Sequence, residues 1–297
     1  MIIDFRYHLA SLIAVFLALG IGILIGGAVL GNAALQKELN QIEENLAKLR
    51  TDQRVLEAEI AKREAELKIL NQFGATSLPV LVRNKLLGKR IALIRTNPSV
   101  DARLARDLTR VFQIAGAKVT STSTILRNPA DLTLEKLQEL KKRLDLDGED
   151  NTAIARGLLR FIADRIANGP MFGAASHDDI LSTLVASRLI ETSGDYGGMV
   201  DAVILIGGSP DANVDLSQQV DRVLIETVSG AKGLLVAAVE TSTAARSYLG
   251  EYLQHPIIVV DNVETVPGQA ALILALVRGK KGHYGIKDAH QLMPEAV

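Results

Sequence analysis

The sequence predicts an α/β protein with an N-terminal transmembrane helix, a coiled-coil stalk and a Rossmann-like or flavodoxin-like three-layer domain with a mostly parallel sheet. An uncharged apolar run opens the chain, leucines at heptad spacing follow it, and short aliphatic segments then alternate with longer helical ones. We expect the following segments: 1–8 (short N-terminal tail), 9–31 (transmembrane helix), 32–73 (coiled coil), 74–88 (linker), 89–280 (α/β domain) and 281–297 (C-terminal tail).

Composition limits the possible functions. Hydrophobic residues make up 48% of the 297 residues and aromatic residues only 4%, so aliphatic side chains must build the core, as in a parallel sheet covered by helices. The formal net charge is -1, so the chain has no excess of Lys and Arg for binding the phosphates of a nucleic acid. We therefore expect no nucleic-acid partner. There is no cysteine, which excludes disulfides and thiolate sites and fits an extracytoplasmic location.

The apolar run from Leu9 to Gln36 contains no charged residue. A membrane helix needs about 20 apolar residues, whereas the apolar region of a signal peptide has about 7–15. An uncleaved anchor is therefore favoured over cleavage after Ala33 and over a buried soluble helix. Gly22 and Gly26 form a GxxxG pair, which lets two helices approach closely; the ordinary glycine content of a membrane helix is the alternative.

The stalk is defined by apolar residues that alternate at spacings of four and three. A stripe this narrow predicts a self-associating coiled coil rather than a helix packed on its own domain. About 38 residues at 1.5 Å each would give a spacer of roughly 55 Å. We expect Gly74 and Pro79 to end the helix. The seam residues are Leu35, Leu39, Ile42, Leu46, Leu49, Leu56, Ile60, Leu67 and Leu70, with Gln53 and Arg63 as interruptions.

Strand–helix alternation begins after Gly88, and the charged segment Arg127–Asn151 is expected to lie outside the sheet. Short aliphatic runs suit strands that are buried on both faces. We expect strands at Arg90–Arg95, Ala117–Thr122, Ala202–Gly207, Leu234–Val239 and Pro256–Asp261. We expect helices at Val100–Ala115, Leu134–Leu144, Ala153–Asn168, His177–Glu191, Leu216–Ser229, Thr243–Tyr252 and Pro267–Arg278.

Polar residues follow the strands at the edge where open parallel sheets bind ligands. No GxGxxG, GK[ST] or GxSxG motif supports dinucleotide, phosphate or hydrolase chemistry, so we predict no catalytic residue and no enzyme. Residues 207–213 are typical of a strand-ending turn, and residues 240–243 of a helix N-cap. The weak candidates for a ligand crevice are Asn97, Ser99, Gly207, Gly208, Ser209, Asp211 and Asp261.

Copper sites prefer clusters of Met, Cys or His. The C-terminal tail holds the only weak metal candidates, His283, His290 and Met293. A solvated or docking tail is the alternative, because Pro294 disfavours a regular helix there.

Two stretches resemble a known family: DFRYHLASLIAVFLALGIGILIGG at Asp4–Gly27 and PGQAALILALVRGKKGHYG at Pro267–Gly285. They are similar to the membrane anchor and the C-terminal segment of the mycobacterial copper transport protein B family, which has a related corynebacterial branch in cell separation. The resemblance covers essentially the whole chain. It implies a role in copper transport or homeostasis, with copper as a possible ligand, and places the stalk and domain outside the cytoplasmic membrane. The flanking charges Arg6 and Lys37 do not decide the orientation.

Three functions are considered, of which an enzyme that uses the strand-end crevice is the least favoured. The first is a single-span envelope protein, anchored in the lipid bilayer, that acts in copper homeostasis by binding or scaffolding. The second is a coiled-coil regulator of an envelope or division partner, without metal. We expect a homo-oligomer formed through the coiled coil, and the residues expected in its contacts are Gly22, Gly26, Leu39, Ile42, Leu46, Leu49, Leu56 and Ile60.

Overall fold

The structure is a computed structural model, which describes residues 5–169, 177–231, 233–287, 289 and 291–294. The chain divides into two compact units, Met1–Leu70 and Asn71–Val297, and each is described by itself.

A single helix, α1 (Phe5–Val82), makes up the described part of the first unit and continues into the second. Its segment Arg6–Gly27 is long and apolar enough to cross a membrane, and none of it is buried within the protein. The predicted N-terminal apolar helix is thus confirmed.

The stalk is helical throughout, and its apolar seam is uncovered. The nine seam residues from Leu35 to Leu70 are all exposed, from 46% at Leu46 to 64% at Leu49. Apolar side chains at this spacing are buried when helices pair. The helix itself is confirmed, whereas its pairing into a coiled coil stays a prediction.

The predicted helix end at Gly74 and Pro79 is wrong, because α1 continues to Val82. Leu78 and Val82 are buried in the core of the second unit. The glycine allows close approach, since a Cβ at Gly74 would lie 3.3 Å from the Val266 side chain. Packing of this last segment outweighs the local preference of proline to stop a helix.

The second unit is built on one seven-stranded sheet with the order β3-β2-β1-β4-β5-β6-β7. Every neighbouring pair is parallel except β2 and β3, which confirms the mostly parallel sheet. The strands are β1 (Arg90–Arg95), β2 (Lys118–Ile125), β3 (Ile190–Gly194), β4 (Ala202–Ile206), β5 (Leu235–Val239), β6 (Ile258–Val260) and β7 (Gly282–Tyr284). The sequence analysis missed β3 and β7.

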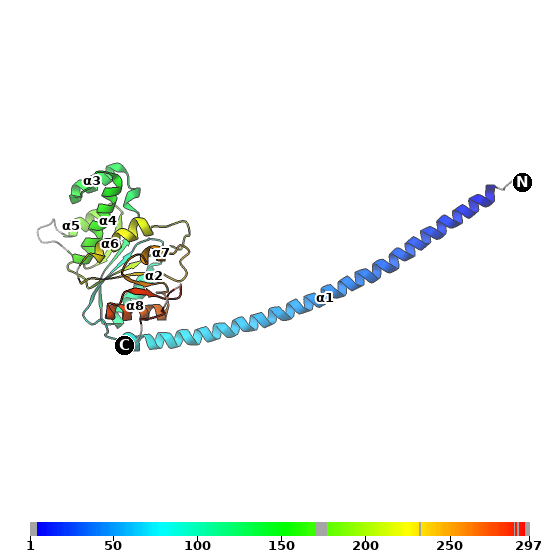
Figure 1. Cartoon of the computed structure of the whole chain (residues 1–297), viewed down its shortest axis with the longest axis horizontal. Helices are drawn as coiled ribbons and strands as arrows, with labels where there is room; N and C mark the ends of the chain where they lie inside the picture. The colour runs from blue at the N-terminus through cyan, green and yellow to red at the C-terminus, as the bar shows by residue number, and fades with distance from the viewer. Residues whose placement is uncertain (1–4, 170–176, 232, 288, 290, 295–297) are drawn as a thin grey trace. The chain divides into compact units, whose positions relative to one another are not determined.

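Helices cover both faces of this sheet (Figure 1). Along β1, Ala92 and Ile94 face a core formed with α3 to α6, while Ile91 and Leu93 face a core formed with α2, α8 and the end of α1. The helices are α2 (Ala102–Ile114), α3 (Leu134–Leu144), α4 (Asn151–Asn168), α5 (His177–Ala186), α6 (Arg222–Ser229), α7 (Leu249–Tyr252) and α8 (Val266–Arg278). The charged segment 127–151 lies outside the sheet, as predicted, and its helix α3 packs on α4.

Three predicted helices are corrected. The helix from His177 ends at Ala186, because Arg188 adopts a positive φ of 52° and the chain returns as β3. The segment 217–221 is a π-helical turn that precedes α6. Residues 241–244 form turns rather than a helix start, and only Leu249–Tyr252 is helical, because a backbone bridge between Ser209 and Arg246 holds this segment in an extended path.

Candidate functional site

The sheet has a topological switch between β1 and β4. The chain passes from β1 to β2 on one side, and β4 later continues the sheet on the other. Open α/β sheets bind ligands at such a point, beyond the carboxyl ends of the strands. A pocket of about 400 Å³ lies there, between the segment after β1 and the segment after β4.

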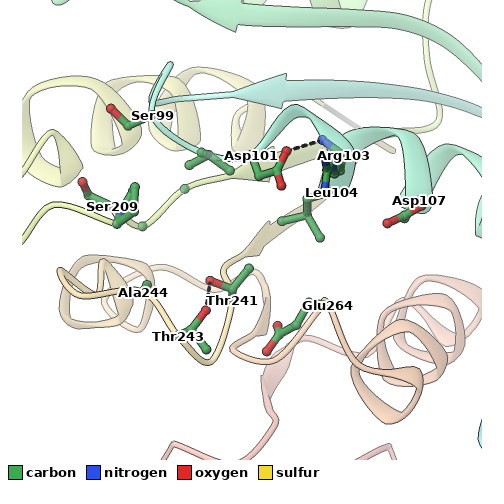
Figure 2. A pocket seen from close by; sticks show the side chains of 14 residues that line it. Ser99, Asp101, Arg103, Leu104, Asp107, Ser209, Thr241, Thr243, Ala244 and Glu264 are labelled. Carbon is green, nitrogen blue, oxygen red and sulfur yellow. Dashed lines mark hydrogen bonds between the residues drawn. The ribbon is translucent and has the colours of Figure 1, made fainter. Parts of the chain in front are cut away.

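Most of the pocket surface is apolar, and it carries hydroxyl groups, three carboxylates and one guanidinium (Figure 2). Asp101 also caps α2 by accepting a 2.8 Å hydrogen bond from Arg103 N. Glu264 accepts a 3.1 Å hydrogen bond from Ser242 N, which ties the loop after β5 to the loop after β6. The polar lining side chains are Ser99, Asp101, Arg103, Asp107, Ser209, Thr241, Thr243 and Glu264. A mostly apolar lining with a few polar groups suits a small ligand that hydrogen bonds orient.

Four of the predicted crevice residues, Ser99, Gly207, Gly208 and Ser209, line this pocket. Asn97 is buried, and its Oδ1 accepts a 2.9 Å hydrogen bond from Ser99 N, so it shapes the loop that carries Ser99.

The turn after β4 is held by local capping, as predicted. Asp211 is exposed and does not line the pocket. Ser209 Oγ accepts a 3.1 Å hydrogen bond from Asp211 N, and Asp211 Oδ1 accepts one of 2.9 Å from Asn213 N. Asp211 thus has a structural role in this turn.

Gly207 and Gly208 allow the chain after β4 to lie close to buried side chains. A Cβ at Gly207 would overlap the Tyr252 hydroxyl and would lie 2.7 Å from Asp221 Oδ2. Gly208 has a φ of +77°, which side chains rarely adopt. The turn between β4 and the pocket therefore requires this Gly-Gly pair.

A buried carboxyl group, Asp221, lies beneath Gly207. It is fully buried and accepts hydrogen bonds from Thr96 Oγ1 at 3.0 Å and from the Tyr252 hydroxyl at 2.5 Å. Burial raises the pKa of Asp221 from 3.8 to about 7, because it disfavours the charged form more than the two hydrogen bonds favour it. The same burial, with the nearby carboxylate, raises the pKa of Tyr252 well above its ordinary value.

A second buried carboxylate, Glu240, follows β5. Its Oε1 lies 2.9 Å from Lys287 Nζ, and its Oε2 accepts a 2.8 Å hydrogen bond from Tyr248 N. Lys287 Nζ also donates to Thr241 O at 3.1 Å. This ion pair connects the C-terminal segment to the loop that lines the pocket.

Asp261 is a third buried carboxylate, and it holds the C-terminal segment. It lies 2.7 Å from His283 Nε2 and accepts hydrogen bonds from Ile286 N at 2.8 Å and Lys287 N at 2.9 Å. Asp261 does not line the strand-end pocket. These contacts fix the first residues of the predicted C-terminal tail against the domain.

The predicted metal candidates are placed as follows. His283 lies on β7 and is paired with Asp261. Met293 is 39% exposed near the end of the described chain, and His290 lies outside the described residues. Within the described ranges, no group of three or more His, Cys, Asp or Glu side chains is arranged to share a metal ion. The metal assignment stays a prediction.

The predicted oligomer contacts all lie on α1. A Cβ at Gly22 or Gly26 would meet nothing within 4 Å, so both positions present open backbone. The six seam residues in this set are exposed.

Sequence reasoning missed the buried network of Asp221, Tyr252 and the Glu240–Lys287 pair. Glu240 directly follows a buried strand, and this position is the one local signal that could have suggested a role. Asp221 and Tyr252 lie in predicted helices, where nothing distinguishes them from surface residues.

The fold and the site together define a class: an α/β domain with a strand-end pocket, preceded by a long helix whose first part fits a membrane anchor. The chain belongs to the family described as "Copper transport outer membrane protein, MctB", whose model matches residues 2–294. It is similar to the copper transporter MctB of Mycobacterium bovis and to that of Mycobacterium tuberculosis. Each relative is 26% identical over 310 residues, which cover 95% of this chain and 96% of the relative.

Proposed function

We propose that this protein is a single-span envelope protein that acts in copper homeostasis by binding or scaffolding rather than by catalysis. Its stalk would bring two or more copies together and hold the α/β domains outside the cytoplasmic membrane. Membership of the copper transport family supports the copper role. The observation that carries the scaffold is the exposed apolar seam of α1, described above.

The seam supports self-association on energetic grounds. Each seam leucine or isoleucine is about half exposed, so its burial contributes about 1 kcal/mol, half of the value for a fully exposed side chain. Nine such positions on each of two chains outweigh the cost of association, which is about 4–15 kcal/mol. A shared N-terminal anchor would align the helices in parallel, which is the arrangement in which equivalent seam positions face each other.

The strand order supports the Rossmann-like assignment of the domain. Six of the strands follow the order 3-2-1-4-5-6 of doubly wound dinucleotide-binding folds, although β3 is antiparallel here. The loop after β1 reads RTNPSVD and has no glycine-rich phosphate fingerprint. The domain therefore resembles dinucleotide-binding folds in its strand order and not in a nucleotide site.

Copper tolerance tests the proposal directly. Cells that lack this protein would be complemented with the wild type or with Leu46→Asn/Leu49→Asn/Leu56→Asn, and growth would be followed as copper is raised. A matched control, Lys48→Asn/Val55→Asn, changes the opposite side of the helix. We expect the seam variant to lose tolerance and the control to keep it. Equal tolerance of both variants, with the seam variant shown to be monomeric, would contradict the scaffold.

Two further measurements define how copper is involved and where. Titration of the purified full-length chain with copper separates direct binding from an indirect role, and His283→Ala tests the tail candidate. Reporter fusions at the C-terminus distinguish an outer from a cytoplasmic domain. If a C-terminal reporter enzyme that works only in the cytoplasm were active, that activity would contradict the proposed topology.

A second candidate function is the binding of an envelope or division protein without metal. It is favoured by Phe73 and Val80, which are 70% and 79% exposed and lie seven residues apart on one side of α1. Exposed apolar surface that is contiguous on one side of a helix is typical of protein contact sites. Capture of partner proteins by the wild type but not by Phe73→Ser/Val80→Ser, with copper tolerance unchanged, would favour this candidate.

A further inference from the structure

A second cavity lies apart from the strand-end pocket, on the surface of α4. It has a volume of about 550 Å³ and is bounded by α4, by the loop 145–148 and by Thr227 of α6. Its lining includes three arginines from α4: Arg156, Arg160 and Arg165.

Arg165 is the unusual member of this set, because it is only 5% exposed. Its guanidinium carbon lies 5.0 Å from the ring centroid of Phe161, one helical turn earlier. Its Nε is buried and has no hydrogen-bond partner, and no ion pair to Arg165 is found in the part of the chain that the structure describes. A buried cation with no counter-charge is strongly unfavourable, and stacking on one ring only partly offsets the loss of water.

The other two arginines of the lining lie nearer the start of α4. Arg156 and Arg160 are exposed and stand one turn apart on α4. Gly157 lies between them, and its nearest neighbour beyond the helix is Asp147 O, 3.5 Å from where a Cβ would be. At this position backbone, rather than a side chain, lines the cavity.

The cavity also contains carboxylates, which limit what can enter. Asp145 and Asp147 belong to the loop, and Asp164 accepts a 2.7 Å hydrogen bond from Asn168 Nδ2. The loop is fixed by Lys141 Nζ, which donates to Gly148 O at 2.6 Å. A ligand must therefore be small, or carry its charge at one end, to reach Arg165 without approaching the loop carboxylates.

We propose that this cavity binds a small oxyanion, a phosphate or carboxylate group, with Arg165 as its buried anchor and Arg160 and Arg156 at the entrance. A guanidinium group matches both anions, because its planar fork donates two parallel hydrogen bonds to two oxygens. The ligand would supply the counter-charge that Arg165 lacks. This site is independent of the proposed copper role.

The test uses the full-length protein in detergent. Its thermal unfolding would be followed during titration with inorganic phosphate, with succinate, and with sodium chloride at matched ionic strength. We expect saturable stabilisation by phosphate or by succinate, and the anion that acts identifies the group preferred. Arg165→Gln should weaken that affinity by about tenfold or more, the loss expected for a charge-assisted anchor. Arg110 is exposed on α2, and Arg110→Gln is the control, which should leave the affinity for the anion unchanged.

Arg160→Gln keeps the proposal testable if Arg165→Gln does not fold, because Arg160 is exposed and its replacement leaves the core intact. It should weaken the same anion several-fold. The proposal is overturned if neither anion gives saturable stabilisation beyond that of chloride. It is also overturned if the arginine variants on α4 bind the anion as tightly as Arg110→Gln does.

Discussion

The Tyr252 hydroxyl donates a 2.5 Å hydrogen bond to Asp221 Oδ2, which also accepts a 3.0 Å hydrogen bond from Thr96. Tyr252 belongs to α7, Asp221 to the π-helical turn before α6, and Thr96 directly follows β1. The contact thus ties together three segments directly below the turn that carries the strand-end pocket. Asp221 Oδ1 has no hydrogen-bond partner among the described residues, so the carboxyl group is only partly compensated for its burial.

Stability should fall as pH rises because of Asp221. Its pKa is about 7 in the folded protein against 3.8 as its ordinary value, so the folded state binds more protons than the unfolded state between these values. The stabilisation is fully present below about pH 4 and is lost as pH rises through 7. Between pH 5 and 8 we expect a loss of roughly 2–3 kcal/mol in the free energy of unfolding, measured by urea denaturation.

The variant Asp221→Asn isolates this effect, because asparagine keeps an acceptor for Tyr252 and Thr96 but does not titrate. Carboxylates with lowered pKa values, such as Asp215 and Glu251, contribute equally to both proteins. We expect the wild type to lose stability relative to Asp221→Asn over this pH range. A difference between the two proteins that does not change with pH would show that Asp221 is ionised throughout.

Gly207→Ala should destabilise the α/β domain. The added methyl group would overlap the Tyr252 hydroxyl and approach Asp221, so the turn or α7 must move. Overpacking of this kind costs about 1–3 kcal/mol, which would appear in the urea midpoint. Gly250→Ala on α7 is a matched control, because its Cβ would meet nothing within 4 Å. Equal stability of both variants would contradict the close packing described here.

Lys287→Met should destabilise the domain by leaving Glu240 buried without its cation. The Lys287 side chain is 25% exposed and that of Glu240 is fully buried, so water only partly replaces the lost partner. We expect a loss of roughly 2–3 kcal/mol in the free energy of unfolding. The double variant Glu240→Gln/Lys287→Met should recover part of it. Additive losses in the double variant would mean that the two charges do not interact.

The central strands were predictable from local sequence, whereas the edges of the sheet were not. β4 is an unbroken aliphatic run, and β1 is aliphatic between its two terminal arginines. Such runs have few alternatives to a strand buried on both faces. β3 reads IETSG and is largely exposed, and β7 has only three residues, one of them glycine. Neither has a pattern that distinguishes it from a loop, because each is defined by pairing with a neighbour.

The site was predictable only in outline. The rule that parallel sheets bind ligands at strand ends located Ser99, Gly207, Gly208 and Ser209 around one pocket. Asp261 and Asp221 could not be assigned in advance, because their roles depend on contacts with residues far away in sequence. The continuation of α1 beyond Gly74 could not be predicted for the same reason. Leu78 and Val82 are buried in a core with residues far away in sequence, and this packing keeps the segment helical.

Disulfide cross-linking through the stalk tests the central claim most directly. The chain has no cysteine, so one introduced residue gives an unambiguous signal. Leu49→Cys places a thiol on the seam, and Thr51→Cys places one on the opposite side of the same helix. After mild oxidation of membranes that contain the full-length protein, we predict a covalent dimer with Leu49→Cys and little with Thr51→Cys. Equal cross-linking at both positions, or none at either, would contradict self-association through the apolar seam.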